Sequence, residues 1–260
     1  MKGRILVIAG SDSGAGAGIQ ADIKTAMALG AYATTAITAL TAQDTLGVHG
    51  VMPVPPEFLR QQISVVLADI GADAVKTGML GDAATIELVA ELLSAAGLPL
   101  VLDPVMVAKG GAPLLAMDAV AALKRALLPL ATVLTPNVPE AEILAGMAIP
   151  DLAAMRHAAD ALLTLGVPAV LLKGGHLAGE TVVDLLATPD GTIALERPRL
   201  PTRHTHGTGC TLATAIAAGL AQGLGLTDAV LRARAYVQAA IAAAPGLGAG
   251  HGPLGHAAAA

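Results

Sequence analysis

The sequence is poor in aromatic residues and in cysteine. Its 260 residues include no tryptophan, one phenylalanine and two tyrosines. The hydrophobic core must therefore be built mainly from aliphatic side chains. The only cysteine, Cys210, excludes an internal disulfide framework and any metal site that needs several cysteine ligands.

Charged residues are also scarce. Aspartate, glutamate, lysine and arginine make up 13% of the chain, and the formal net charge is −5. A negatively charged chain is repelled by phosphate backbones, so this balance argues against binding to DNA or RNA. Hydrophobic residues make up 54%, which predicts a large core, and 260 residues suffice for one large α/β domain.

Long apolar runs and targeting signals are missing too. The longest apolar stretch, 212–226, is interrupted by polar residues and glycines and is too short to span a bilayer. The N-terminus has the pattern of a strand followed by a loop, not that of a signal peptide. We therefore expect a cytoplasmic protein with no membrane partner.

Several common nucleotide and metal motifs are absent. No segment has the G-x-x-x-x-G-K-S/T pattern of a P-loop. The dinucleotide-binding pattern G-x-G-x-x-G would start at Gly14 and Gly16, but Ile19 stands where the third glycine is required. The seven histidines lack the spacing of a zinc site. These absences disfavour a nicotinamide-dependent oxidoreductase.

Apolar runs of strand length alternate with helical patterns along most of the chain. This alternation predicts a mostly parallel sheet with helices on both faces, in one domain over residues 1–244. We expect a hairpin or flap at 45–54, an antiparallel hairpin at 181–196 and a loosely held Gly- and Ala-rich tail at 245–260. The predicted parallel strands are 4–9, 33–40, 74–76, 100–102, 132–134 and 169–172.

Polar side chains follow these strands. Ligands of open α/β sheets bind beyond the carboxyl ends of the strands, so the polar residues found there predict one common site. The residues at the strand ends are Asp12, Gln43, Lys76, Asp103, Asn137 and Lys173.

Two glycine-rich turns also precede predicted helices. Residues 206–210 run into a helix, and such a turn directs backbone N–H groups and the positive end of the helix dipole at one point. The alternative is a capped buried helix with Cys210 as a small apolar filler. The glycines of 10–18 would let a ligand approach the backbone, or would form only a tight turn.

The strand-end residues allow both functional and structural interpretations. Asp103 and Glu140 suit Mg²⁺, which takes one or two carboxylates and keeps several waters. Asn137 and Glu140 also have the spacing of a helix capping box. Lys173 would neutralise phosphate or simply be solvated, and the Gln43 amide suits the edge of a heterocycle or a solvated loop.

Seven blocks of the sequence carry a resemblance to a known family. They are AGSDSGAGAGIQADIKT (9–25), TALTAQDT (38–45), KTGML (76–80), LDPVM (102–106), LTPNVPEAE (134–142), LLKGGH (171–176) and HGTGCTLATAIA (206–217). In this order the blocks resemble the bacterial hydroxymethylpyrimidine/phosphomethylpyrimidine kinases of thiamine biosynthesis, in the ribokinase-like superfamily. The resemblance runs from about residue 5 to residue 243. In two mild departures, Ala15 and Asp44 stand where many relatives have Gly and Asn.

The resemblance implies a three-layer α/β/α sandwich and a homodimer. It also implies ATP- and Mg²⁺-dependent phosphorylation of 4-amino-5-hydroxymethyl-2-methylpyrimidine and then of its monophosphate. Residues 106–111 would form a mobile cover. By this resemblance, the residues that contact the pyrimidine would be Gln43, Gly10, Ala17, Asp22, Met79 and Val105. The transferred phosphoryl group would lie at Gly207, Thr208, Gly209 and Cys210. The ATP phosphates and Mg²⁺ would lie near Lys173, Asn137, Glu140 and Asp103.

Cys210 is the candidate proton acceptor, because the start of a helix favours a thiolate. Full proton transfer from an alcohol to this thiolate would be uphill by roughly 7 pKa units, on the order of 10 kcal/mol. In a loose phosphoryl-transfer transition state the proton leaves late, so we expect a late acceptor rather than a strong base or a nucleophile. The remaining alternatives are a pyridoxal kinase and a non-catalytic pyrimidine-binding module.

Overall fold

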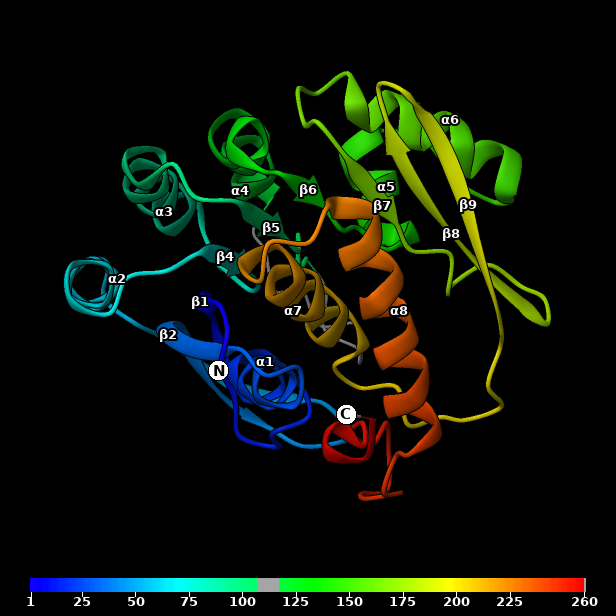
Figure 1. The fold of residues 1–260 in the computed structure, drawn as a ribbon, viewed down its shortest axis with the longest axis horizontal. Coiled ribbons are helices and arrows are strands. Elements are labelled where there is room, and N and C mark those ends of the chain that lie inside the picture. The colour runs from blue at the N-terminus through cyan, green and yellow to red at the C-terminus, as the bar shows by residue number, and fades with distance from the viewer. Residues whose placement is uncertain (107–116, 260) are drawn as a thin grey trace.

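The computed structural model describes residues 1–106 and 117–259. Strands in this part of the chain form one nine-stranded sheet in the order β3-β2-β1-β4-β5-β6-β7-β8-β9 (Figure 1). The strands are β1 (Arg4–Asp12), β2 (Tyr32–Gln43), β3 (Val48–Pro53), β4 (Ala74–Thr77), β5 (Leu100–Leu102), β6 (Val133–Leu134), β7 (Val170–Leu172), β8 (Thr181–Thr188) and β9 (Gly191–Pro198).

The middle of the sheet is parallel, as the alternation of strands and helices predicts. Strands β2, β1, β4, β5, β6 and β7 pair in parallel, whereas β3 at one edge and the β8–β9 hairpin at the other pair antiparallel. Parallel strands place their carboxyl ends at one edge of the sheet. The residues that follow these strands can therefore share a site.

Helices cover both faces of the sheet. Helices α1, α7 and α8 pack on one face, and α2 to α6 pack on the other (Figure 1). The three-layer prediction is confirmed. The helices are α1 (Gly18–Ala28), α2 (Pro56–Asp69), α3 (Ala83–Ala96), α4 (Met117–Ala122), α5 (Val138–Ala145), α6 (Leu152–Leu163), α7 (Thr208–Ala221) and α8 (Leu226–Ala242).

Strand β1 shows why the sequence gives two packed faces. Ile5 and Val7 belong to the core under α1, α7 and α8, whereas Leu6 and Ile8 belong to the core on the opposite face. All four side chains have no exposed surface. A strand buried on both faces must be apolar at every position, which explains the continuous apolar run.

Two local predictions need correction or lie outside the described residues. Residues 45–54 do not form a hairpin of their own, because β3 pairs antiparallel with β2, with Leu40 opposite Met52. The alternating pattern identified a strand but not its partner. The proposed mobile cover at 106–111 falls almost entirely outside the described residues. No helix in the described ranges is long and apolar enough to cross a membrane.

The C-terminal tail is not loosely held, contrary to the prediction. The backbone N–H groups of Gly250 and His251 donate to Thr45, at 3.1 and 2.9 Å. Leu254 is only 4% exposed, and the buried ring of His256 lies 3.0 Å from the hydroxyl of Thr211 on α7. Composition alone hid these contacts, because Gly and Ala leave few side chains to reveal burial.

We therefore expect Leu254→Ala to lower the free energy of unfolding by about 2–4 kcal/mol, because it leaves a cavity under the tail. The control is Leu247→Ala, since Leu247 is 60% exposed. This control should change stability by less than about 0.5 kcal/mol. Urea denaturation of both variants measures the difference, and equal stabilities would show that the tail does not pack in solution.

Candidate active site

The N-terminal turn of α7 joins two groups of strand-end residues. On one side the imidazole of His206 lies 2.9 Å from Asp12 and 3.2 Å from the Gln43 amide. On the other side a Cβ added at Gly209 would lie 3.4 Å from the Lys173 ammonium and 3.5 Å from an Asp103 oxygen. The predicted common site at the sheet edge therefore has two halves that meet at this helix.

The start of α7 has the geometry of an anion site. Gly207 is the N-cap residue with φ of 84°, a conformation that favours glycine. A Cβ there would lie 1.8 Å from the carbonyl oxygen of Gly16, so the turn packs directly on the 10–18 loop. The first-turn N–H groups of a helix have no acceptor within it, and Thr208, Gly209 and Cys210 occupy this turn.

The glycine-rich loop after β1 is organised by Asp12. Its buried carboxylate accepts N–H groups from Gly14, Gly16 and Ala17 at 2.8–3.1 Å. Burial opposes ionisation, but the hydrogen bond from His206 and these backbone donors hold the pKa of Asp12 below its usual value. Asp12 is therefore an anion that closes the loop.

The same loop holds one residue in a conformation that favours glycine. Ala15 has φ of 58°, a left-handed conformation that few residues other than glycine adopt. Ala15 is thus a mildly strained position in the loop.

Some of the residues predicted to contact a pyrimidine are linked in the structure. A Cβ added at Gly10 would lie 2.6 Å from the Met79 methyl carbon, and a chain of hydrogen bonds through His206 and Asp12 connects Gln43 with the N–H of Ala17. Val105 is half-buried just after β5. Asp22 differs, because its side chain has no exposed surface and lies beneath the others.

The second half of the site is an ionic cluster. Lys173 donates to Asp103 at 3.1 Å, and the Thr135 hydroxyl lies 3.3 Å from the same oxygen. Burial lowers the pKa of Lys173, but Asp103 and Glu140 outweigh this effect and raise it overall. The lysine is therefore a fixed positive charge at the end of β7.

Asn137 and Glu140 do form the capping box that the spacing allowed. The Asn137 side chain accepts the Glu140 N–H at 3.0 Å, and Glu140 accepts the Asn137 N–H at 2.8 Å. Glu140 nevertheless lies within the ionic cluster. Burial raises its pKa to about 7, Lys173 opposes this rise and Asp103 adds to it. The structural role and a role in the site coexist.

The donor set fits Mg²⁺ bound through water. Among residues 1–106 and 117–259, no group of three or more His, Cys, Asp and Glu side chains could hold a metal ion. Two buried carboxylates, Asp103 and Glu140, lie close enough to share the charge of Lys173. Two carboxylates suit a Mg²⁺ ion that keeps its waters and takes phosphate oxygens as further ligands.

Lys76 does not lie at the surface of the site, as its predicted strand-end position suggested. It belongs to β4, is fully buried and donates to both oxygens of Asp22 at 2.9 and 3.0 Å. Thr214, one turn along α7 from Cys210, donates to the same carboxylate at 2.6 Å. A buried ion pair therefore forms the floor of the site.

The prediction that Cys210 favours the thiolate is wrong. Cys210 is half-buried, and the Gly18 N–H donates to its sulfur. Burial raises the pKa of the thiol to about 11, Lys76 opposes this rise, and Asp22 and Asp103 add to it. The helix dipole suggested the opposite sign, because the sequence did not show that the thiol is desolvated and lies near two carboxylates.

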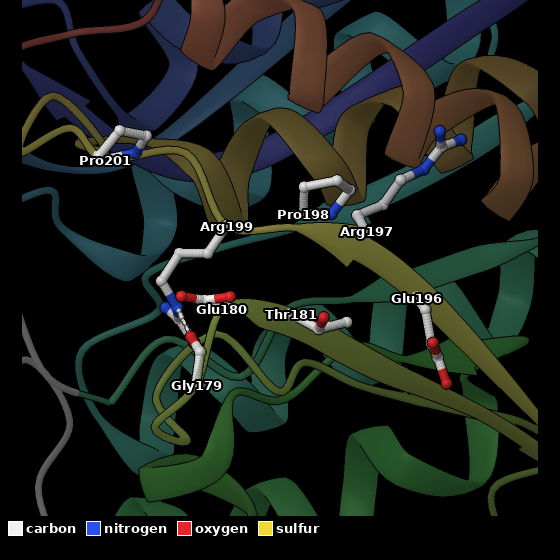
Figure 2. Close-up of a pocket in the computed structure, with 8 residues that line it drawn as sticks. All are labelled: Gly179, Glu180, Thr181, Glu196, Arg197, Pro198, Arg199 and Pro201. Atoms are coloured by element: carbon white, nitrogen blue, oxygen red, sulfur yellow. Dashed lines mark hydrogen bonds between the residues drawn. The ribbon is translucent and has the colours of Figure 1, made fainter.

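A separate cleft of about 740 Å³ lies where β8 begins and β9 ends. Figure 2 shows the Arg199 side chain reaching toward Gly179, to whose carbonyl it donates at 2.7 Å. Arg199 also donates to the carbonyls of Gly175 and Leu177. None of the predicted site residues lines this cleft, so Arg199 supports the loop after Lys173 rather than marking a ligand position.

His206 was given no role of its own by the sequence. Its contacts run to residues more than 160 positions away, so no local pattern could reveal them. The one available signal was its position directly before the Gly207 turn.

Comparisons with known proteins agree with this geometry. The family model described as phosphomethylpyrimidine kinase matches residues 12–255. A hydroxymethylpyrimidine/phosphomethylpyrimidine kinase of Streptomyces coelicolor is 50% identical over 97% of this chain and 93% of its own length. The chain belongs to the phosphomethylpyrimidine kinase family.

Two other similar proteins differ from this chain in length or in the substrate for which they are named. A bifunctional thiamine biosynthesis protein of Geobacter sulfurreducens is 52% identical over 98% of this chain, which spans only 52% of that longer protein. An ADP complex of a Bacillus subtilis pyridoxal kinase is 39% identical, with a TM-score of 0.93 over 99% of this chain and 98% of that one. The ribokinase-like fold is thus shared by kinases named for two different substrates.

Proposed function

We propose that this chain transfers a phosphoryl group from ATP to the hydroxymethyl group of 4-amino-5-hydroxymethyl-2-methylpyrimidine. It then phosphorylates the monophosphate to the diphosphate, as a step of thiamine diphosphate biosynthesis. Family membership over residues 12–255 supports the reaction class. The observation that carries the proposal is that the start of one helix meets Gln43, through His206, on one side, and Lys173 and Asp103 on the other.

The pyrimidine occupies the half formed by β1 and β2. Gln43 offers an amide donor and an acceptor side by side, which complements an aminopyrimidine edge. Gly10, Ala17, Met79 and Val105 form the surrounding wall, and the contact of Gly10 with Met79 supports this arrangement. Asp22 acts from beneath this wall, where it holds Lys76.

The phosphates occupy the half formed by β5, β6 and β7. Gly207, Thr208 and Gly209 present backbone donors to the transferred group, and Lys173 adds a fixed positive charge. Asp103 and Glu140, with Asn137 holding Glu140 in place, would hold Mg²⁺ through water. Bound Mg²⁺ would neutralise phosphate charge as it develops. Most of the rate then comes from positioning and charge neutralisation.

Cys210 is the proton acceptor for the hydroxymethyl group in this proposal. Only the thiolate can accept a proton, and a pKa of about 11 makes this form scarce at neutral pH. In a loose transition state the nucleophile is deprotonated late, so the hydroxyl proton passes to the Cys210 thiolate only as the new bond is completed, and only the ionised fraction of the enzyme is competent. The raised pKa therefore makes the rate sensitive to pH rather than abolishing it.

The second candidate function is pyridoxal phosphorylation, which the similarity to a pyridoxal kinase favours. Pyridoxal also carries a hydroxymethyl group on an aromatic ring, so both substrates could use the same phosphate half. The two differ at the ring edge that faces Gln43. Comparing kcat/KM for pyridoxal and the pyrimidine decides between them.

We further propose that the protein is a cytoplasmic homodimer. Exposed apolar side chains gather on β2, β3 and the segments around them, which supports a contact between two copies. Sedimentation equilibrium at micromolar concentration tests this proposal, and the mass of a single chain would contradict it. The exposed residues are Leu40, Leu46, Val51, Met52 and Phe58.

A coupled assay of ADP formation tests the proposed function. We expect turnover with hydroxymethylpyrimidine, further turnover with its monophosphate, and loss of both when Mg²⁺ is removed with a chelator. Restoring Mg²⁺ is the control for the chelator. If the pyrimidine binds but no ADP forms, the chain is a binding module and not a kinase.

Cys210→Ala should lower kcat by about 10²-fold, because a positioned proton acceptor is lost, while KM for the pyrimidine changes less than about threefold. The wild-type kcat should rise between pH 7 and pH 9, since a pKa of about 11 lets the thiolate fraction grow throughout this range. The alanine variant should lack this rise. An unchanged kcat in the variant would rule out the acceptor role.

A further inference from the structure

His206 lies where four parts of the chain meet. Its backbone N–H donates to the Gly252 carbonyl of the C-terminal tail at 3.1 Å. Its ring packs on Gly16, where an added Cβ would lie 2.3 Å from a ring carbon. Its Nε2 atom faces Asp12 from β1 and Gln43 from β2. The imidazole is buried, with its Nε2 edge facing Asp12 and Gln43 and a ring carbon packed on Gly16.

The hydrogen-bonding groups around His206 determine which atom carries a proton. Nε2 lies 2.9 Å from Asp12 Oδ2 and 3.2 Å from the Gln43 amide nitrogen, and one ring nitrogen holds either a proton or a lone pair. Asp12 is an acceptor, because its oxygens already receive N–H groups from Gly14, Gly16 and Ala17. Nε2 must therefore carry the proton.

This proton fixes the orientation of the Gln43 side chain. The two ends of an amide have nearly the same shape, so the hydrogen bonds around it decide which end points where. In the structure the amide nitrogen is the end nearer Nε2, and the amide oxygen lies 3.2 Å from the Thr41 hydroxyl. A protonated Nε2 needs the amide oxygen instead, because the amide nitrogen brings donor against donor, so the hydrogen bonds favour the amide turned over end for end. The Thr41 hydroxyl donates to the Ser11 carbonyl at 3.0 Å, and its lone pairs can then accept from the amide nitrogen.

We propose that His206, held by Asp12, is a positioning residue that locks the Gln43 amide with its oxygen toward the imidazole and so selects a 4-aminopyrimidine over a 4-oxopyrimidine. This inference rests on the proposed function, in which Gln43 contacts the pyrimidine. A 4-amino ring presents a ring-nitrogen acceptor beside an amino donor. A 4-oxo ring presents the reverse pattern, an N–H donor beside a carbonyl acceptor.

A fixed orientation is needed because an amide that is free to rotate by 180° could hydrogen-bond to either ring. In one fixed orientation, the Gln43 amide can hydrogen-bond with only one of the two rings. The other ring would place its N–H donor against the amide N–H and its carbonyl acceptor against the amide oxygen. Sites built to hydrogen-bond one pattern reject the wrong one strongly, since buried polar groups are left unpaired. His206 thus controls specificity without touching the substrate.

The test compares kcat/KM for the 4-amino substrate and its 4-oxo analogue. We expect the wild-type chain to favour the amino ring by about 10³-fold or more. His206→Leu should reduce this ratio by at least about tenfold, through loss with the amino ring and gain with the oxo ring, while KM for ATP stays unchanged. His206→Gln, which keeps an N–H donor near the Nε2 position, should retain most of the ratio.

The matched control is His157→Leu, which removes an exposed histidine on α6 and should leave both rates unchanged. A purely structural role for His206 would lower both rates together, raise KM for ATP and leave the ratio intact, and this result would overturn the proposal. If the wild-type chain turns over neither pyrimidine, the proposed function fails instead.

A second measurement keeps the inference testable even where His206→Leu does not fold. Long-range ¹H–¹⁵N correlation spectra of the wild-type chain, labelled at histidine nitrogens, report which ring nitrogen carries a proton. The His206 signals are identified by their loss in His206→Gln. A proton on Nε2 is expected, and a proton on Nδ1 alone would overturn the proposal.

Discussion

The ion pair between Lys76 and Asp22 supports the rest of the site. It joins β4 to α1 and, through the 2.6 Å hydrogen bond from Thr214, to α7. Burial lowers the pKa of Lys76, but the negative charges of Asp22, Cys210 and Asp103 raise it by more than burial lowers it. The lysine therefore stays charged. Removing one partner of such a pair leaves an uncompensated buried charge and costs about 3–5 kcal/mol. The ion pair thus fixes the positions of the sheet, α1 and α7 relative to one another.

That arrangement matters because α7 and the residue just before its N-cap contact both halves of the site. His206, just before it, contacts Asp12 and Gln43, and Gly209 in its first turn lies against Lys173 and Asp103. A shift of α7 along the sheet would therefore change the distance between the Asp12 and Gln43 side of the site and the Lys173 and Asp103 side. Placement within about 1 Å is what efficient group transfer requires.

The sequence revealed those features of the site that depend on local pattern. Strand ends follow from apolar runs, so Gln43, Asp103 and Lys173 could be assigned to one edge before any coordinates were known. Lys76 could not be placed, because its partner Asp22 is 54 residues away and only the fold brings them together. The prediction of a loosely held C-terminal tail was wrong for a related reason. The tail contacts Thr45 and Thr211 through backbone and histidine groups, which hydrophobic periodicity does not reveal.

Burial and carboxylates together set the pKa of Cys210. Burial is the larger cause and raises the pKa of the thiol to about 11, and Asp22 and Asp103 add to this rise. Burial likewise raises the pKa of Glu140 to about 7, and Asp103 adds to it. In the proposed function a divalent cation held by Asp103 and Glu140 would offset the repulsion between these carboxylates and incoming phosphates. The same cation would remove part of the carboxylate contribution that disfavours the thiolate, so the proposed metal site and the proposed proton acceptor are electrostatically linked.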